Sequence, residues 1–344
     1  MFPSSFHPLV RSWFAETYGK ATAVQEEAWP LIAAGENVLA VAPTGSGKTL
    51  TAFLAAISRF IDGTYDAASL AVLYVSPLKA LNEDIRRNIL EPLRSLKDYF
   101  ARAGEPFPDI RVETRSGDTP ESQRRRFLAA PSSILAVTPE SLAILLLNPR
   151  GRAALSRVKY LILDEIHSVL AGKRGAFLSC QIDRLSLAAG EFQRTALSAT
   201  VRPESAAAEF MGGIGRPVRI VSPEIEKKIE GLVEFPPDPP GASVPAGENG
   251  EGPSHYGKRY AALVETVLER LGFDGERCRR VVLVLTDSRQ RAERAALLIN
   301  KRAAELAAQK GSLPPPEQVA FAHHGSLSRE VRRALVDKQG YAFR

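Results

Sequence analysis

A segment rich in glycine, followed by a lysine and a threonine, has the residue types that bind phosphate. Ala42-Pro-Thr-Gly-Ser-Gly-Lys-Thr49 lies between an apolar run, Val38–Val41, and a helix-like stretch, Leu50–Arg59. A strand, a tight loop and a helix in this order are the surroundings that a phosphate-binding loop requires. Ala42 stands where the general pattern has a glycine, so an ordinary glycine-rich turn is the alternative interpretation.

The residue types in this loop suit a nucleotide. Glycine lets backbone N–H groups converge on phosphate oxygens, and the N-terminus of the following helix favours the same anions. We expect Lys48 to reach the β- and γ-phosphates and the Thr49 hydroxyl to ligate Mg²⁺. The nucleotide ligands predicted here are Thr44, Gly45, Ser46, Gly47, Lys48 and Thr49.

Two carboxylates, Asp164 and Glu165, follow directly after the apolar run Tyr160–Leu163. In open α/β sheets ligands bind outside the carboxyl ends of the strands, which places both acids beside the phosphate-binding loop. Asp164 is suited to hold Mg²⁺ through its water shell, and Glu165 to orient and deprotonate an attacking water. Alone, two acids after a strand usually just begin a loop. Together with the glycine-rich segment they predict hydrolysis of a nucleotide.

A third polar segment, Ser198-Ala-Thr200, follows the strand-like run Thr195–Leu197. Alone it would be a commonplace turn. Its place after the phosphate-binding loop and the two acids makes Ser198 and Thr200 candidates for a relay that couples the nucleotide state to a second lobe.

The elements that must position these residues are buried strands separated by helices. Fully apolar runs, unlike alternating ones, indicate strands covered on both faces, hence parallel sheets. The pattern predicts an α/β fold with a doubly wound parallel sheet. The runs are Val38–Val41, Leu70–Val75, Ile134–Val137, Tyr160–Leu163, Thr195–Leu197, Val281–Leu285 and Val319–Ala322.

The chain divides at a segment rich in proline and glycine. This segment has almost no large side chains to bury, so we expect an exposed linker, with a long surface loop inside one domain as the alternative. The predicted organisation is a first lobe at 1–234, the linker at 235–257 and a second lobe at 258–344. The second lobe offers two apolar runs and the helix-like stretch Gln290–Gln309, and is expected to be incomplete.

Composition excludes several classes of protein. The 344 residues are 44% hydrophobic and 24% charged, as in an ordinary globular protein. A net charge of +6 is compatible with a polyanionic partner without requiring one. The 2 cysteines lie far apart and suggest neither a zinc site nor a disulfide framework. A signal-peptide pattern and an apolar run of the ~20 residues that span a membrane are both missing, so we expect a cytoplasmic protein without membrane association.

Taken in order, these motifs resemble those of the superfamily 2 DEAD/DEAH-box helicases. Further segments that carry the resemblance are Gln25, Ser76-Pro-Leu-Lys-Ala-Leu81, Gly117-Asp118, Thr138-Pro-Glu-Ser-Leu142 and Asp164-Glu-Ile-His167. Phe6-His-Pro8, Gln25–Pro30 and His323-His-Gly-Ser-Leu-Ser328 look most like the large helicase-related (Lhr) branch. The resemblance implies a P-loop NTPase with a RecA-like first lobe, followed by a partial RecA-like second lobe.

The resemblance also implies ligands. Gln25 is expected to bind the adenine edge of ATP through its side-chain amide. Residues in turns or after strands are expected to hold successive phosphates of one strand, which carries little sequence information and weakens with salt. The nucleic-acid ligands implied are Pro77, Lys79, Gly117, Thr138, Pro139 and Glu140. The implied partner is single-stranded or partly duplex nucleic acid, with DNA, alone or in hybrid with RNA, favoured over RNA alone.

Two interpretations remain open for each of three further groups of residues. Arg124-Arg-Arg126 could extend the phosphate-binding track or form a solvated helix face, and we favour the face. His167 could contact the Ser198–Thr200 relay, as the family suggests, or be structural. His323-His324 resembles a family motif in the second lobe, and without a third ligand nearby we expect no metal site there.

The family's glutamine-and-arginine motif, which reaches the γ-phosphate, has no counterpart after Ser328. Such an arginine can be worth ~10³–10⁵ in rate, so turnover is expected to be impaired while nucleotide binding persists. The leading prediction is an ATP-dependent helicase or translocase that hydrolyses ATP with Mg²⁺. The alternatives are an ATP- and nucleic-acid-binding fragment without useful turnover, and a P-loop enzyme unrelated to nucleic acid, which the Ser-Pro-Leu-Lys and Thr-Pro-Glu segments argue against.

Overall fold

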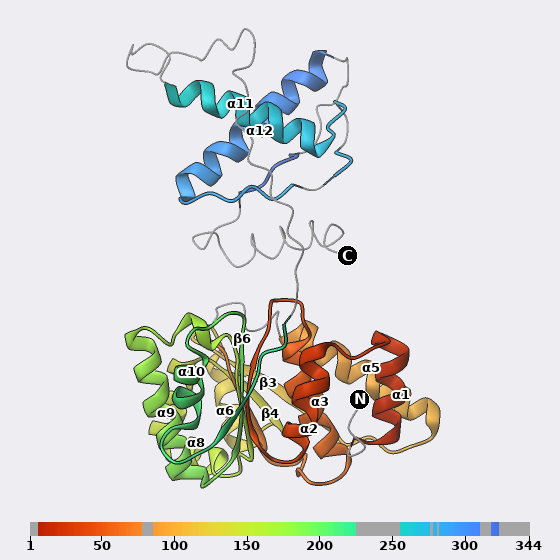
Figure 1. Ribbon diagram of the computed structural model, residues 1–344, viewed down its shortest axis with the longest axis vertical. Helices are drawn as coiled ribbons and strands as arrows, with labels where there is room; N and C mark the ends of the chain where they lie inside the picture. The colour runs from red at the N-terminus through yellow and green to blue at the C-terminus, as the bar shows by residue number, and fades with distance from the viewer. Residues whose placement is uncertain are drawn as a thin grey trace. The chain divides into compact units, whose positions relative to one another are not determined.

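The computed structural model divides the chain into two compact units, Met1–Lys227 and Lys228–Arg344, both traced in Figure 1. The structure describes residues 6–77, 85–224, 255–275, 278–280, 282–309 and 318–322. The segment expected as a linker, 235–257, lies outside these ranges except for residues 255–257, where a helix begins at His255. None of the helices in the described ranges is both long and apolar enough to cross a bilayer.

The first unit is built on one seven-stranded sheet with the order β3-β4-β2-β5-β6-β1-β7. Every neighbouring pair runs parallel, and the prediction of a parallel α/β sheet is confirmed. The strands are β1 (Asn37–Val41), β2 (Val72–Val75), β3 (Val112–Arg115), β4 (Ile134–Val137), β5 (Tyr160–Leu163), β6 (Gln193–Ser198) and β7 (Val218–Val221).

Helices cover both faces of this sheet, as Figure 1 shows. Successive strand residues point to opposite faces, so Val38 and Ala40 pack with one helical layer, and Leu39 and Val41 with the other. The first layer contains α1 (Pro8–Tyr18), α2 (Ala23–Ala33), α3 (Lys48–Ile61), the π-helical turn η1 (Arg86–Leu90) and α5 (Glu91–Ala103). The second contains α6 (Glu121–Ala129), α7 (Pro139–Leu147), α8 (Pro149–Leu155), the 3-10 turn η2 (Ile166–Ser168), α9 (Lys173–Ala189) and α10 (Glu204–Gly212).

The second unit packs two helices, α11 (His255–Leu271) and α12 (Arg289–Gln309), around a small apolar core that includes Val264, Leu268 and Ile299. The helix expected at Gln290–Gln309 is confirmed. The strand pairs of a RecA-like lobe are not found among the described residues of this unit.

The prediction of two strands in the second unit is therefore wrong. Residues 282–285 are irregular, and Leu283 and Leu285 are 71% and 85% exposed. Residues 319–322 are irregular too, because the side-chain amide of Asn300 takes the place of a neighbouring strand. Its Oδ1 accepts from the N–H groups of Val319 and Ala320 at 2.8 and 2.9 Å. A strand needs a row of backbone partners, and an apolar run alone does not supply them.

Candidate ATP and nucleic-acid site

Most of the predicted site residues that the structure describes lie along one edge of the first unit's sheet. Because all strands are parallel, the loops that follow them leave from the same carboxyl edge. The strands that precede the nucleotide motifs are adjacent, β5-β6-β1, and those that precede the nucleic-acid residues are adjacent as well, β3-β4-β2. The edge therefore has two contiguous halves, which meet where β2 pairs with β5.

The phosphate-binding loop joins β1 to α3 as predicted. Gly45 and Gly47 have φ values of +81° and +85°, a region that residues with side chains rarely adopt. Lys48, the first residue of α3, is 6% exposed. Its ammonium donates to the carbonyl groups of Ala42 and, at 2.8 Å, Pro43. Two carbonyl groups of the loop thus hold the ammonium group of Lys48.

Gln25, in the first turn of α2, packs directly on this loop and is 2% exposed. Its amide nitrogen donates to the Gly47 carbonyl at 3.4 Å, and its amide oxygen accepts from the Thr22 N–H at 3.0 Å. The Thr22 hydroxyl donates to the Ser46 carbonyl at 2.8 Å. Sequence reasoning missed Thr22, although Thr-x-x-Gln before a helix is a capping-box pattern that could have indicated it. Adenine binding by Gln25 stays a prediction.

Asp164 is 7% exposed at the end of β5. Its carboxylate accepts from the Tyr74 hydroxyl at 2.5 Å and from the Glu165 N–H at 2.8 Å. Burial raises the pKa of Asp164 to about 6, against the opposing effects of the Tyr74 hydrogen bond and the Lys48 ammonium. That influence of Lys48 indicates that the charges of the loop and of the acidic strand act on each other. Tyr74 was missed because it lies inside an apolar run.

Glu165 has a φ of 51°, the only positive value outside glycine in the described part of the chain. Its carboxylate lies 3.3 Å from His167 Nδ1, and the same nitrogen lies 3.4 Å from the N–H of Ala199. One nitrogen cannot donate to Glu165 and accept from Ala199 at once, so the proton on Nδ1 decides which bond forms. His167 thus links the acidic loop to the Ser198–Thr200 segment.

The two relay residues differ in their surroundings. Ser198 ends β6 beside Val41 of β1 and is fully buried. Its hydroxyl has no hydrogen-bond partner among the described residues, while its carbonyl accepts from the Ala42 N–H at 3.1 Å. Thr200 is exposed. Ser198 therefore lies against the entry to the phosphate-binding loop.

The nucleic-acid half contains predicted residues with different exposures. Pro77 is buried just after β2, and Pro139 is the buried first residue of α7. Thr138 caps this helix, and its hydroxyl accepts from the Ser141 N–H at 3.3 Å. Gly117 is exposed two residues beyond β3. The predicted ligand Lys79 and the His323-His324 pair lie outside the described residues.

Two arginines contact the segments that follow the three strands of this half. Arg124 of α6 donates to the Gly117 carbonyl at 2.8 Å. Arg174, in the first turn of α9, donates to the Pro77 carbonyl at 2.8 Å and to both carboxylate oxygens of Glu140 at 2.8 and 3.2 Å. Partial burial acts to raise the pKa of Glu140, but the hydrogen bond and charge of Arg174 help produce a net lowering. Sequence reasoning missed Arg174, since a basic pair beginning a helix is typical of a solvated surface.

The residues predicted to hold a magnesium ion are Thr49, through its hydroxyl, and Asp164, through its carboxylate. Mg²⁺ is usually held by one or two carboxylates together with substrate phosphates and water, so the chemistry of this pair fits the ion. The described residues contain no cluster of three or more His, Cys, Asp or Glu side chains that could hold a metal by themselves.

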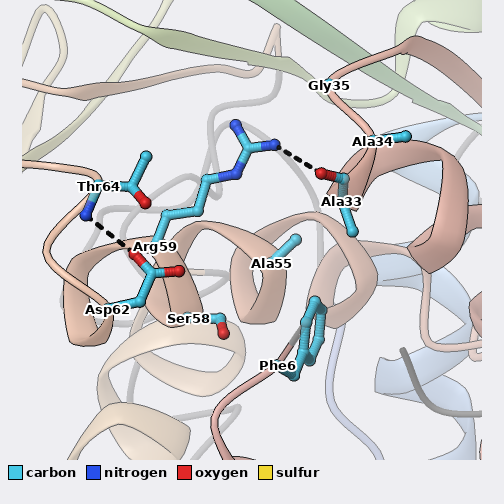
Figure 2. Close-up of a pocket in the computed structure, with 9 residues that line it drawn as sticks. All are labelled: Phe6, Ala33, Ala34, Gly35, Ala55, Ser58, Arg59, Asp62 and Thr64. Carbon is cyan, nitrogen blue, oxygen red and sulfur yellow. Dashed lines mark hydrogen bonds between the residues drawn. The ribbon is translucent and has the colours of Figure 1, made fainter. Parts of the chain in front are cut away.

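A hollow of about 340 Å³ lies at the far end of α3, away from the phosphate-binding loop (Figure 2). Arg59, on its wall, donates to the carbonyl groups of Ile32 and Ala33 at 2.9 and 3.5 Å and to the Gln193 side chain at 2.9 Å. The guanidinium thereby ties the end of α2 to the start of β6. The predicted site residues do not line this hollow.

The fold and the loop geometry define a P-loop NTPase with a RecA-like sheet. A family model described as DEAD/DEAH box helicase matches residues 22–208, more than half of the chain. The chain belongs to the DEAD/DEAH box helicase family, and the resemblance found in its motifs is confirmed.

Two curated relatives belong to the Lhr branch. The chain is 39% identical over 338 residues to the ATP-dependent helicase Lhr-Core protein 2 of Thermococcus barophilus, covering 96% of this chain and 36% of that protein. It is 36% identical over 366 residues to the Lhr helicase/uracil glycosylase of Escherichia coli, covering 98% of this chain and 23% of that protein. The chain thus spans about a third or less of these relatives.

Solved structures agree with the fold. The Mycobacterium smegmatis helicase Lhr bound to ssDNA and AMP-PNP matches with a TM-score of 0.80 and 38% identity, over 98% of this chain and 41% of that one. The DEAD-box helicase Mss116 bound to ssRNA and UDP-BeF matches with a TM-score of 0.69 at 16% identity, over 97% and 62% of the two chains. This second likeness concerns the fold alone.

Proposed function

We propose that the chain is the ATP- and nucleic-acid-binding part of an ATP-dependent helicase or translocase that acts on DNA and hydrolyses ATP with Mg²⁺. The observation that carries the proposal is the division of one sheet edge into two contiguous halves. Nucleotide chemistry follows β5, β6 and β1, and the backbone and hydroxyl groups suited to phosphates follow β3, β4 and β2. Both ligands would then contact one rigid sheet.

The nucleotide half supplies the charges that hydrolysis requires. Gly45, Gly47 and the N-terminus of α3 would surround the phosphates, and Lys48 would exchange its loop carbonyl partners for β- and γ-phosphate oxygens. Thr49 and Asp164 would hold Mg²⁺, which neutralises the charge that develops on the phosphates. Glu165 would orient the attacking water and accept its proton.

One similar solved structure favours DNA as the nucleic acid that the chain binds. The similar Lhr helicase structure contains ssDNA, whereas the neighbour that contains ssRNA is similar in fold alone. Binding through backbone, hydroxyl and ammonium groups would tolerate many sequences and would weaken as salt increases.

The alternative function is binding of ATP and nucleic acid without useful turnover. It would apply if no arginine, from this chain or from a partner, reaches the γ-phosphate. Without that arginine, catalysis would fall by ~10³–10⁵ while the binding loops stay intact.

Steady-state ATP hydrolysis with and without single-stranded DNA tests these proposals, beside a titration with a non-hydrolysable ATP analogue. The expected result is turnover that DNA stimulates and that Lys48→Ala abolishes. Analogue binding without turnover would support the binding fragment instead. RNA of the same sequence in a parallel arm tests the preference for DNA, and equal stimulation by both would contradict it.

A further inference from the structure

We propose that Arg174 is a positioning residue that holds Pro77, just after β2, and Glu140, in the first turn of α7, in register for nucleic-acid binding. The inference rests on the proposed nucleic-acid function of those loops. It assigns to Arg174 and Glu140 a role in building the binding surface, and not in touching phosphates themselves.

The geometry of the contact is the first support. One planar guanidinium donates to three acceptors: the Pro77 carbonyl at 2.8 Å and the two carboxylate oxygens of Glu140 at 2.8 and 3.2 Å. Pro77 follows β2, and Glu140 is in the first turn of α7 after β4, so the contact bridges two neighbouring strands. A lysine ammonium cannot match this planar fork.

Charge is the second support. Glu140 was predicted to bind nucleic acid, but a carboxylate repels phosphates, and both of its oxygens are bonded to Arg174. If Glu140 only lies near the bound strand, removing its charge should tighten nucleic-acid binding. If Glu140 helps Arg174 to set the geometry of the binding surface, removing its charge should weaken binding. The two roles therefore predict opposite signs.

The placement of Arg174 itself is the third support. It is followed by Gly175, where a Cβ atom would lie 2.4 Å from the Val169 carbonyl oxygen and 3.1 Å from that of Leu170. The start of α9 is therefore packed against the backbone that follows Glu165 and η2. The backbone that carries Arg174 therefore packs on the turn after Glu165, and its side chain reaches from there to Pro77 and Glu140 in the nucleic-acid half.

Stability is a poor alternative explanation for the contact. The side chains of Arg174 and Glu140 are 44% and 53% exposed, and exposed ion pairs contribute little to folding. We therefore expect the variants to lower the unfolding midpoint by no more than about 2–4 °C. A purely structural bracket would lower the midpoint and the binding of both ligands together.

The experiment measures binding of a fluorescent single-stranded oligodeoxynucleotide to the full 344-residue chain with a non-hydrolysable ATP analogue. The variants are Arg174→Ala, Arg174→Lys and Glu140→Gln. Arg184→Ala, which removes an equal charge from the same helix, serves as the control. Affinity for the ATP analogue and the unfolding midpoint are measured for each protein.

We expect each of the three variants to weaken DNA binding by about tenfold. The ATP analogue should bind as before, and the control should change by less than about twofold. Tighter DNA binding by Glu140→Gln, or full rescue by Arg174→Lys, would overturn the inference, as would unchanged binding by Arg174→Ala. If the unaltered chain binds no DNA, both the proposed function and this inference fail. If it binds DNA, the effects of the variants test this inference separately from the proposed function.

Discussion

Glu165 combines a proposed chemical role with an unfavourable backbone conformation. Its φ of 51° lies in the left-handed region, which costs a residue with a side chain about 1–2 kcal/mol. The carbonyl of Glu165 accepts from the N–H and the hydroxyl of Ser168 at 3.0 and 2.8 Å, which holds the turn in place. Strain of this kind persists where the surrounding structure fixes a functional group. Stability and catalysis should therefore respond to substitution in opposite directions.

We expect Glu165→Gly to leave the free energy of unfolding unchanged or to raise it by up to about 1 kcal/mol, because glycine adopts this φ without steric cost. ATP turnover should fall by about 10²–10⁴, because the water loses its base. Glu165→Gln should lose turnover equally without gaining stability. Urea denaturation and steady-state ATPase assays on both variants check this. A glycine variant less stable than the glutamine variant would contradict the strain argument.

At the scale of elements, the phosphate-binding loop and the start of α2 form one packed unit. A Cβ atom on Gly47 would lie 2.7 Å from the amide nitrogen of Gln25, while one on Gly45 would meet nothing within 4 Å. The two glycines have nearly equal φ values, so they differ in contact and not in backbone strain.

We therefore expect Gly47→Ala to lower the free energy of unfolding by about 1 kcal/mol more than Gly45→Ala, the loss of a Gln25 hydrogen bond being the cause. In a Gln25→Ala background the two substitutions should cost the same. Urea denaturation of the parent, the three single variants and the two double variants gives two double-mutant cycles. An equal cost of both substitutions in the unaltered background would show that Gln25 moves aside freely.

Sequence reasoning found the central strands and missed the edges. β1, β2, β4, β5 and β6 are buried on both faces because helices cover them. β3 reads Val-Glu-Thr-Arg and β7 reads Val-Arg-Ile-Val, and these two form the edges of the sheet, where side chains are partly exposed. The two false strands of the second unit show the converse, since an apolar run becomes a strand only with a partner.

The site was predicted where residue type and spacing carry the chemistry. The loop at 42–49 and the acids Asp164 and Glu165 follow the expected strands. The contacts of Tyr74, Thr22 and Arg174 were not predicted, because each joins segments that are distant in sequence and the types themselves are ordinary. The sequence can indicate a residue such as Thr22 through its capping-box pattern, but the contacts themselves are seen only in the fold.

Glu191, in the connection between α9 and β6, forms an ion pair whose contribution to stability should be lost in acid. The carboxylate of Glu191 accepts from Arg216 at 2.5 and 2.8 Å, and Arg194 lies 3.5 Å away. The hydrogen bond from Arg216 lowers the pKa of Glu191 from 4.5 to about 2. A lowered pKa stabilises the folded state above pH 4.5, and this contribution is lost as pH falls towards about 2.

We expect Glu191→Gln to flatten the pH dependence of the free energy of unfolding between pH 4.5 and about 2. The side chain is 69% exposed, so solvent screening limits the effect to about 1 kcal/mol or less. Arg216→Gln, which removes the partner, should flatten the same interval. Urea denaturation at several pH values measures it, and a Glu191→Gln profile parallel to that of the parent would count against the pair.

At the scale of the whole molecule, the residues predicted to bind the nucleotide all belong to the first unit. Both large apolar cores lie there too, one on each face of the sheet, while the second unit has a separate core around α11 and α12. A unit with its own cores is expected to fold by itself.

We therefore expect residues 1–227 alone to unfold cooperatively and to bind a non-hydrolysable ATP analogue, with Lys48→Ala as the control that removes binding. DNA-stimulated turnover should be absent, because a motor needs a second lobe to close over the nucleotide. Calorimetry of the shortened chain with and without the analogue is the measurement. If it shows no cooperative transition, the first unit depends on the second for folding. If it folds without binding, the nucleotide site requires residues beyond Lys227, and the two-halved sheet edge would not be sufficient to hold ATP.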